Sequence, residues 1–137
     1  MQTQLLKRIS EQPCDNFHWL EIVCKLQNSK IKKKIITLIG PTACNKTSIA
    51  VHLVKKFPIS IIGVDSVQIY KRFNIGSAKP PKEILEKYRH HLVDSADPEN
   101  IFSVKDFYDQ AYRIVLQAHS NNRIPLLVGG TMMYFNA

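Results

Sequence analysis

A phosphate-binding loop is the first feature of the sequence that could do chemistry. Residues 40–47 read GPTACNKT and match the pattern G-x-x-x-x-G-K-[ST] except that Asn45 replaces the second glycine. Backbone N–H groups of such a loop surround phosphate oxygens, the lysine adds a positive charge and the hydroxyl residue reaches Mg²⁺. The sequence therefore predicts a phosphate site with Lys46 and Thr47 in register for these contacts.

Asn45 is the one departure from this pattern. We expect a left-handed backbone there, which costs a residue with a side chain roughly 1 kcal/mol, although Asn tolerates it better than other non-glycine residues. We also expect Asn45 to impair the close approach of the backbone to phosphate. The alternative interpretation is an ordinary strand-to-helix turn capped by Thr42 or Asn45.

Elements that could position this loop alternate along the chain. Short apolar runs bounded by Gly and Pro are separated by helix-length amphipathic stretches, which is typical of a parallel sheet with crossover helices. The predicted fold class is therefore α/β, a three-layer P-loop-type parallel sheet with flanking helices. We expect strands at 35–39, 60–64, 91–94 and 124–128, and helices at 46–56 and 103–120, the second opened by Ser103 and Asp106. We place strand 60–64 next to strand 35–39.

Composition limits the possible settings. The net charge of +8 favours a polyanionic partner, and 45% hydrophobic residues favour a globular chain. The cysteines at 14, 24 and 44 have neither metal-ligand spacing nor the density of a disulfide framework, which favours a reducing cytoplasm. No apolar run approaches the roughly 18 residues of a membrane span, and no secretory signal is recognisable. We expect a cytoplasmic monomer without membrane contact.

The first 34 residues differ from the rest and are expected to form a separate N-terminal extension. Apolar positions fit one helix over residues 17–26. Four lysines at 30 and 32–34 follow it, either as a solvated face or as contacts to RNA phosphates.

Further motifs lie beyond the phosphate loop. They are VDSVQIYKRFNIGSAKP at 64–80, HHLVD at 90–94, the pair Asp97 and Pro98, and IPLLVGGTMMY at 124–134. In order and spacing these segments resemble tRNA dimethylallyltransferases, over residues 35–137. The departures from the family pattern are Asn45, Cys44, Arg72, Asn74 and Ser77. Family members are about twice this length, so the resemblance implies a P-loop prenyltransferase core that is truncated at its C-terminus.

The resemblance implies a transferase that modifies tRNA. A dimethylallyl group would move from dimethylallyl diphosphate to N6 of the adenine 3′-adjacent to the anticodon, with Mg²⁺ as cofactor and the tRNA anticodon stem-loop as partner. Asp65 would accept the N6 proton, and Thr131 would contact the tRNA side of the channel. The implied substrate-binding residues are Gly40, Pro41, Thr42, Ala43, Cys44, Asn45, Lys46, Thr47, Asp65, Ser66, Val67 and Gln68, with Thr47 also at the metal.

Plainer interpretations remain open. Asp65 could cap a turn after a strand, and residues 129–131 could be a tight strand-to-helix turn. A truncated non-catalytic remnant is an alternative to the enzyme, and a small P-loop nucleotide kinase is another, less favoured because its arginines do not cluster as a lid. His90 and His91 lack metal-ligand spacing, so we expect one ring to face the core and the other solvent.

Overall fold

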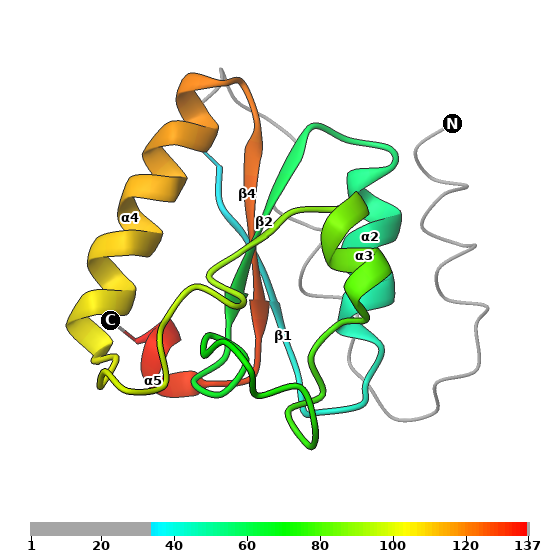
Figure 1. Cartoon of the computed structure of the whole chain (residues 1–137). Coiled ribbons are helices and arrows are strands. Elements are labelled where there is room, and N and C mark those ends of the chain that lie inside the picture. The colour runs from blue at the N-terminus through cyan, green and yellow to red at the C-terminus, as the bar shows by residue number, and fades with distance from the viewer. Residues whose placement is uncertain (1–33, 137) are drawn as a thin grey trace. The chain divides into compact units, whose positions relative to one another are not determined.

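A parallel sheet lies at the centre of the computed structural model, which describes residues 34–136 (Figure 1). Its strands are β1 (Ile36–Ile39), β2 (Ile59–Val64), β3 (His90–His91) and β4 (Ile124–Gly129), and their order across the sheet is β1-β4-β2-β3. All three neighbouring pairs are parallel. The predicted α/β class is confirmed.

β4 occupies the middle of this sheet, so our placement of strand 60–64 next to strand 35–39 is wrong. Leu126 of β4 pairs with Ile36 on one side and with Ile61 on the other. Its side chain is fully buried. The apolar runs of β2 and β4 are equally typical of buried strands, and the sequence therefore did not distinguish which one lies beside β1.

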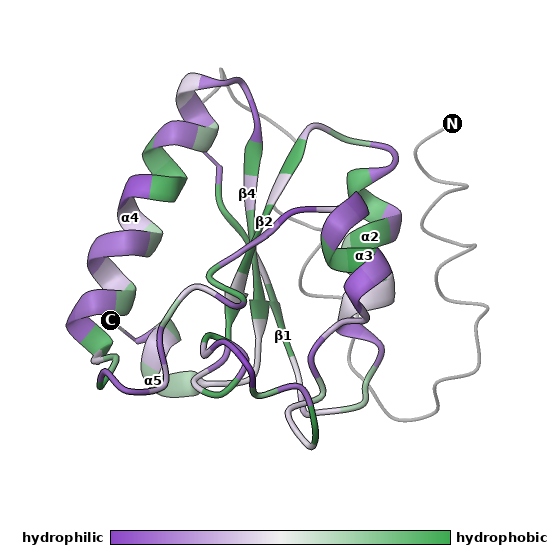
Figure 2. Ribbon diagram, in the orientation of Figure 1, coloured by the Kyte–Doolittle hydropathy of each residue, from purple (hydrophilic) through white to green (hydrophobic). Residues whose placement is uncertain are grey.

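Two longer helices cover opposite faces of the sheet, α2 (Lys46–Val54) and α4 (Val104–Ser120) (Figure 1). Figure 2 shows both apolar and polar residues along α4, and its buried Phe107, Ala111 and Ala118 recur at helical spacing. The predicted capping box is present: Ser103 Oγ accepts from the Asp106 N–H at 3.1 Å, and Asp106 Oδ2 accepts from the Ser103 N–H at 2.9 Å.

Two short helices were not predicted, α3 (Lys82–Lys87) and α5 (Met132–Phe135). Each is too short to show a clear apolar period. The helix expected at 17–26 lies outside the described residues. Among residues 34–136, no helix has the length and hydropathy needed to cross a bilayer.

The third strand is shorter than expected. It ends at His91, because Leu92 and Asp94 adopt left-handed backbones with φ of 61° and 52°. Leu92 is nevertheless buried in the core with Ile62, Val64 and Phe107. The apolar character of residues 92 and 93 therefore reflects burial in a turn, and the prediction of a strand over 91–94 is wrong beyond its first residue.

Candidate functional site

Three predicted segments meet at one edge of the sheet, where β1, β2 and β4 end. The Gly40 N–H, at the start of the phosphate loop, donates to the Gly129 carbonyl at 3.4 Å. The Thr131 N–H donates to the Val64 carbonyl at 3.3 Å. Because β4 is central, the turn that follows it contacts both neighbouring strand ends. This is the edge at which parallel α/β sheets usually bind ligands.

Gly129 allows this close approach. It is paired with Ile39 of β1 and with Val64 of β2. A Cβ atom on residue 129 would lie 2.0 Å from the Val64 carbonyl oxygen. Since backbone atoms occupy that space, only glycine fits without separating the strands.

The phosphate loop holds its lysine against its own backbone. Lys46 Nζ donates to the Gly40 carbonyl at 2.8 Å and to the Pro41 carbonyl at 2.5 Å. Cys44 Sγ lies 3.5 Å from the same nitrogen. The ammonium group is thus positioned over the loop, near the amino end of α2. Positive charge from the lysine and from the helix end suits an anion there.

Asn45 has the predicted left-handed backbone, with φ of 59°. It is the N-cap residue of α2, but its side chain makes no capping hydrogen bond. Ala43 is left-handed as well, with φ of 66°. The alternative of an ordinary turn capped by the Asn45 side chain is therefore wrong, while the strain expected for a replaced glycine is present.

Asp65 follows β2 directly and is fixed by its own turn. Its Oδ1 accepts from the backbone N–H groups of Val67 at 2.9 Å and Gln68 at 3.0 Å. Within residues 34–136, no hydrogen bond involves Oδ2. One carboxylate oxygen therefore does cap the turn, as the plainer interpretation held, and the other remains available to a ligand.

Thr131 and Asp65 are brought together through Ser66. Thr131 Oγ1 accepts from the Ser66 N–H at 3.1 Å. The hydroxyl hydrogen can still be donated elsewhere, because a hydroxyl both donates and accepts. Val67, which follows Ser66, is about half exposed.

Gln68 contacts the chain itself. Its Nε2 donates to the carbonyls of Ser77 at 3.1 Å and Ala78 at 3.0 Å. The side chain thus ties the turn after β2 to the segment that ends the IGSAKP motif. This role was not foreseen from the sequence, which assigned Gln68 to the substrate.

An ion pair between a buried lysine and a partly exposed carboxylate was also missed. The Lys79 side chain is only 4% exposed, and its Nζ contacts Asp94 Oδ1 at 2.6 Å and the Tyr70 carbonyl at 3.0 Å. Arg72 pairs with Asp97 at 3.2 Å on the surface. Lys79 lies within the motif and could have indicated an ion pair, but the spacing of residues did not identify Asp94 as its partner.

Tyr134 is a further neighbour of the site that the sequence did not identify as such. Its ring stacks on Phe107 with centroids 4.3 Å apart. Burial raises the pKa of the Tyr134 phenol, and the nearby Asp65 carboxylate raises it further. The phenol therefore stays protonated, and its ring packs α5 against α4.

His90 and His91 form β3, the outermost strand on the side of the sheet away from β1, and both are half-buried. The expected split between a core-facing and a solvent-facing ring is wrong. Burial lowers the pKa of His90, against a smaller opposing effect of its bond to the Tyr88 carbonyl. Burial lowers the pKa of His91 too, and the charges of Arg89, Arg123 and His90 add to this.

Metal binding at the site would depend on few protein groups. Among the described residues, no group of three or more His, Cys, Asp or Glu side chains could hold a metal ion. Thr47 supplies a hydroxyl at the start of α2. An oxygen donor of this kind suits Mg²⁺, which keeps several waters and commonly binds through one or two protein ligands and substrate phosphates.

Comparisons with known proteins agree with this geometry. The IPP transferase family model matches residues 68–137. A tRNA dimethylallyltransferase of Dichelobacter nodosus is 47% identical over 103 residues, which is 75% of this chain and 32% of that protein. The full-length tRNA isopentenylpyrophosphate transferase of Bacillus halodurans superposes with a TM-score of 0.73 at 42% identity, over 77% of this chain and 35% of that one.

A eukaryotic dimethylallyltransferase solved while acting on tRNA superposes with a TM-score of 0.72 at 30% identity, over 76% of this chain and 26% of that one. The matched part of the chain spans about a third of the length of the curated relatives. Because the family model matches half of its residues and a solved member superposes at 42% identity, the chain belongs to the IPP transferase family.

Proposed function

We propose that residues 35–137 form the diphosphate-binding and catalytic part of a tRNA dimethylallyltransferase. The proposal rests on one observation: hydrogen bonds hold the phosphate loop, the Asp65 turn and Thr131 together at the carboxyl edge of the sheet. Relatives named for this activity match about three-quarters of the chain at 47% identity. The acceptor would be N6 of the adenine 3′-adjacent to the anticodon.

In this proposal the loop binds the leaving group. Residues 42–47 would hold the diphosphate of dimethylallyl diphosphate through backbone N–H groups, and Lys46 would move its ammonium from the Gly40 and Pro41 carbonyls to a phosphate oxygen. As the bond between C1 and the diphosphate oxygen breaks, negative charge develops on the diphosphate. The lysine and the helix end stabilise that charge.

Asp65 would take up the proton. N6 of the adenine attacks C1 of the allyl group, a C–N bond forms, and the N6 proton passes to Asp65 Oδ2. The two backbone bonds to Oδ1 orient the carboxylate, so that the second oxygen can face the amine. The adenine must leave its stack to reach this edge, as in other enzymes that act on a base.

Thr131 would have two parts in this arrangement. Its oxygen fixes the Ser66 N–H and with it the Asp65 turn, while its hydroxyl hydrogen would contact the tRNA side of the channel. Ser66 and Val67 would lie against the adenine. Gln68 would act by holding the segment around Ser77.

Mg²⁺ fits the proposed site as a partner of the diphosphate. Thr47 would hold it through its hydroxyl, with water and phosphate oxygens as the remaining ligands. When bound, the ion would neutralise part of the diphosphate charge. The net charge of +8 supports binding to a tRNA anticodon stem-loop. A protein that modifies tRNA would act in the cytoplasm, and we propose that it acts as a monomer.

The test is transfer of labelled dimethylallyl diphosphate to an anticodon stem-loop RNA. It should be run with the 137-residue chain alone and with a polypeptide that supplies the remaining two-thirds of the Dichelobacter nodosus relative. Transfer in the second mixture, absent when this chain is omitted, would support the proposal. No transfer in either mixture would favour a non-catalytic remnant.

A further inference from the structure

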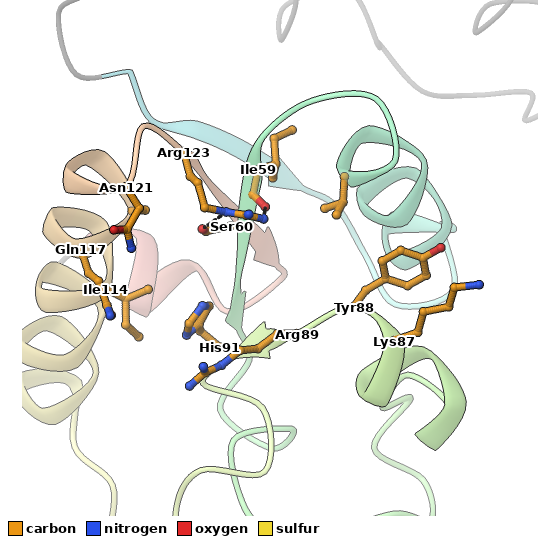
Figure 3. Close-up of a pocket in the computed structure, with 12 residues that line it drawn as sticks. Ile59, Ser60, Lys87, Tyr88, Arg89, His91, Ile114, Gln117, Asn121 and Arg123 are labelled. Carbon is orange, nitrogen blue, oxygen red and sulfur yellow. Dashed lines mark hydrogen bonds between the residues drawn. The ribbon is translucent and has the colours of Figure 1, made fainter.

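A second pocket lies at the opposite edge of the sheet from the phosphate loop (Figure 3). Its volume is about 340 Å³, and its lining includes Val54 at the end of α2, Ile59 at the start of β2 and Arg123 just before β4. A parallel strand of six residues separates the two edges by roughly 17 Å. The pocket is therefore distinct from the proposed transfer site.

The charged side chains that line this pocket are all cationic. They are Lys87, Arg89 and Arg123, joined by the half-buried His91, and none of the lining residues is Asp or Glu. Within residues 34–136, neither Lys87 nor Arg89 forms an ion pair with a carboxylate. In contrast, Lys82 of the same helix α3 pairs with Glu86.

One of these cations is held in place. Arg123 Nε donates to Ser60 Oγ at 3.0 Å, and its Nη2 donates to the Ile59 carbonyl. These bonds orient the guanidinium beside the start of β2, and Figure 3 shows it on the same side of the pocket as Ser60. A fixed guanidinium loses less conformational entropy when it binds an anion.

His91 lines the pocket together with both arginines. Burial lowers the pKa of His91, and the positive charges of Arg89 and Arg123, which line the same pocket, lower it further. Figure 3 shows Arg89 next to His91, with Ile114 and Gln117 of α4 and Asn121, the residue that caps this helix, across from them. One wall is thus cationic, and the facing wall supplies an apolar side chain and two amides.

We propose that this pocket binds a phosphorylated small molecule of about mononucleotide size. Two guanidinium groups with free N–H donors suit phosphate oxygens. The amides and apolar side chains suit the uncharged part of such a ligand, and the volume is at the lower end of small-molecule sites, about 300 Å³ and above. A phosphate of an RNA backbone has the same chemistry, and the test separates the two sources.

Calorimetric titration of the 137-residue chain would test the proposal with AMP, inorganic phosphate, adenosine and an anticodon stem-loop RNA as probes. We expect AMP and phosphate to bind, and adenosine to bind about tenfold more weakly than AMP or worse. Arg89→Gln should weaken AMP by about tenfold or more. Lys82→Gln, the matched control on α3, should leave AMP binding unchanged.

Several outcomes would overturn the assignment. These are no binding of AMP or phosphate, equal binding by wild type and Arg89→Gln, and loss of AMP binding in Lys46→Ala alone, which would assign the ligand to the phosphate loop. Binding of the stem-loop that depends on Arg89, without binding of AMP, would identify RNA as the source of the phosphate. Circular dichroism would check that Arg89→Gln is folded. Lys87→Gln is a second variant of a cation that lines the same pocket.

Discussion

Thr131 Oγ1 accepts a hydrogen bond from the backbone N–H of Ser66, 65 residues earlier in the chain, at 3.1 Å. The bond joins the turn after β4 to the turn that carries Asp65. It makes Thr131 a positioning residue for the candidate base, in addition to any contact with RNA.

Thr131→Val should therefore loosen the Asp65 turn. The substitution keeps the shape of the side chain but removes the acceptor, which leaves a partly buried N–H without its partner and should lower the free energy of unfolding by about 1 kcal/mol. Urea denaturation would measure this, and amide exchange at Ser66 should become faster. Thr131→Ser should restore both, and Thr37→Val, on an exposed position of β1, should change neither.

Lys46→Ala should weaken diphosphate binding in the presence of Mg²⁺. A charge-assisted contact is worth roughly 1.5–3 kcal/mol. Calorimetry with inorganic diphosphate would measure the loss, with Lys82→Ala as the control on an exposed lysine. Equal affinity in wild type and Lys46→Ala would remove the loop from the site.

Asn45→Gly should tighten diphosphate binding. Glycine adopts the observed φ of 59° without steric strain and leaves more room for the phosphate beside the loop backbone. Arg72→Gly is a matched control, because Arg72 has φ of 67° and also replaces a glycine of the family pattern. Both substitutions should relieve strain, measured as thermal stability, but only Asn45→Gly should change the affinity. Weaker binding by Asn45→Gly would mean that the Asn45 side chain is itself a ligand.

Acid should destabilise the chain through His90 and His91. Burial lowers the pKa of each below 6.5, so the unfolded chain binds more protons than the folded chain as the pH falls through that value. The stability is present above about pH 6.5 and decreases below it. Urea midpoints at several pH values should show this decrease, and His90→Gln and His91→Gln should each reduce it. His52→Gln, at an exposed histidine on α2, serves as control, and a decrease that persists in both test variants would contradict the assignment.

Local patterns in the sequence predicted the elements and loops of this site. They did not predict which strands pair with one another or which distant charges meet. The phosphate loop, the left-handed Asn45 and the Ser103 capping box all depend on residues close in sequence, and all were predicted. The position of β4 between β1 and β2 depends on contacts more than 60 residues apart, such as Ile61 with Leu126. The same holds for Lys79 and Asp94, since neither charge indicates by spacing alone that the two side chains pair.

Strand order also changes the reason for choosing Asp65 as the base. We expected it to follow the neighbour of β1, but β2 is separated from β1 by β4. Asp65 still lies at the shared edge, because the turn after β4 contacts both the Gly40 and Ser66 segments. The two competing carboxylates are engaged elsewhere, Asp94 with buried Lys79 and Asp97 with Arg72.

Asp65→Asn should consequently abolish most of the transfer rate while leaving the structure and the diphosphate affinity intact. Asn can still accept the N–H groups of Val67 and Gln68 through Oδ1, so the turn is retained, but its amide cannot take up the N6 proton. The measurement is single-turnover transfer to a stem-loop RNA, with this chain complemented by the remaining two-thirds of a relative.

Asp94→Asn and Asp97→Asn are the matched comparisons, and thermal unfolding separates their effects from catalysis. Asp94→Asn should lower the melting temperature, because it leaves the Lys79 ammonium, 4% exposed, without its carboxylate. Asp97→Asn removes only a surface pair and should have little effect on either stability or rate. If Asp65→Asn transfers at a near-normal rate while a fully folded Asp94→Asn or Asp97→Asn does not, the base is not Asp65, and the proposed proton path is wrong.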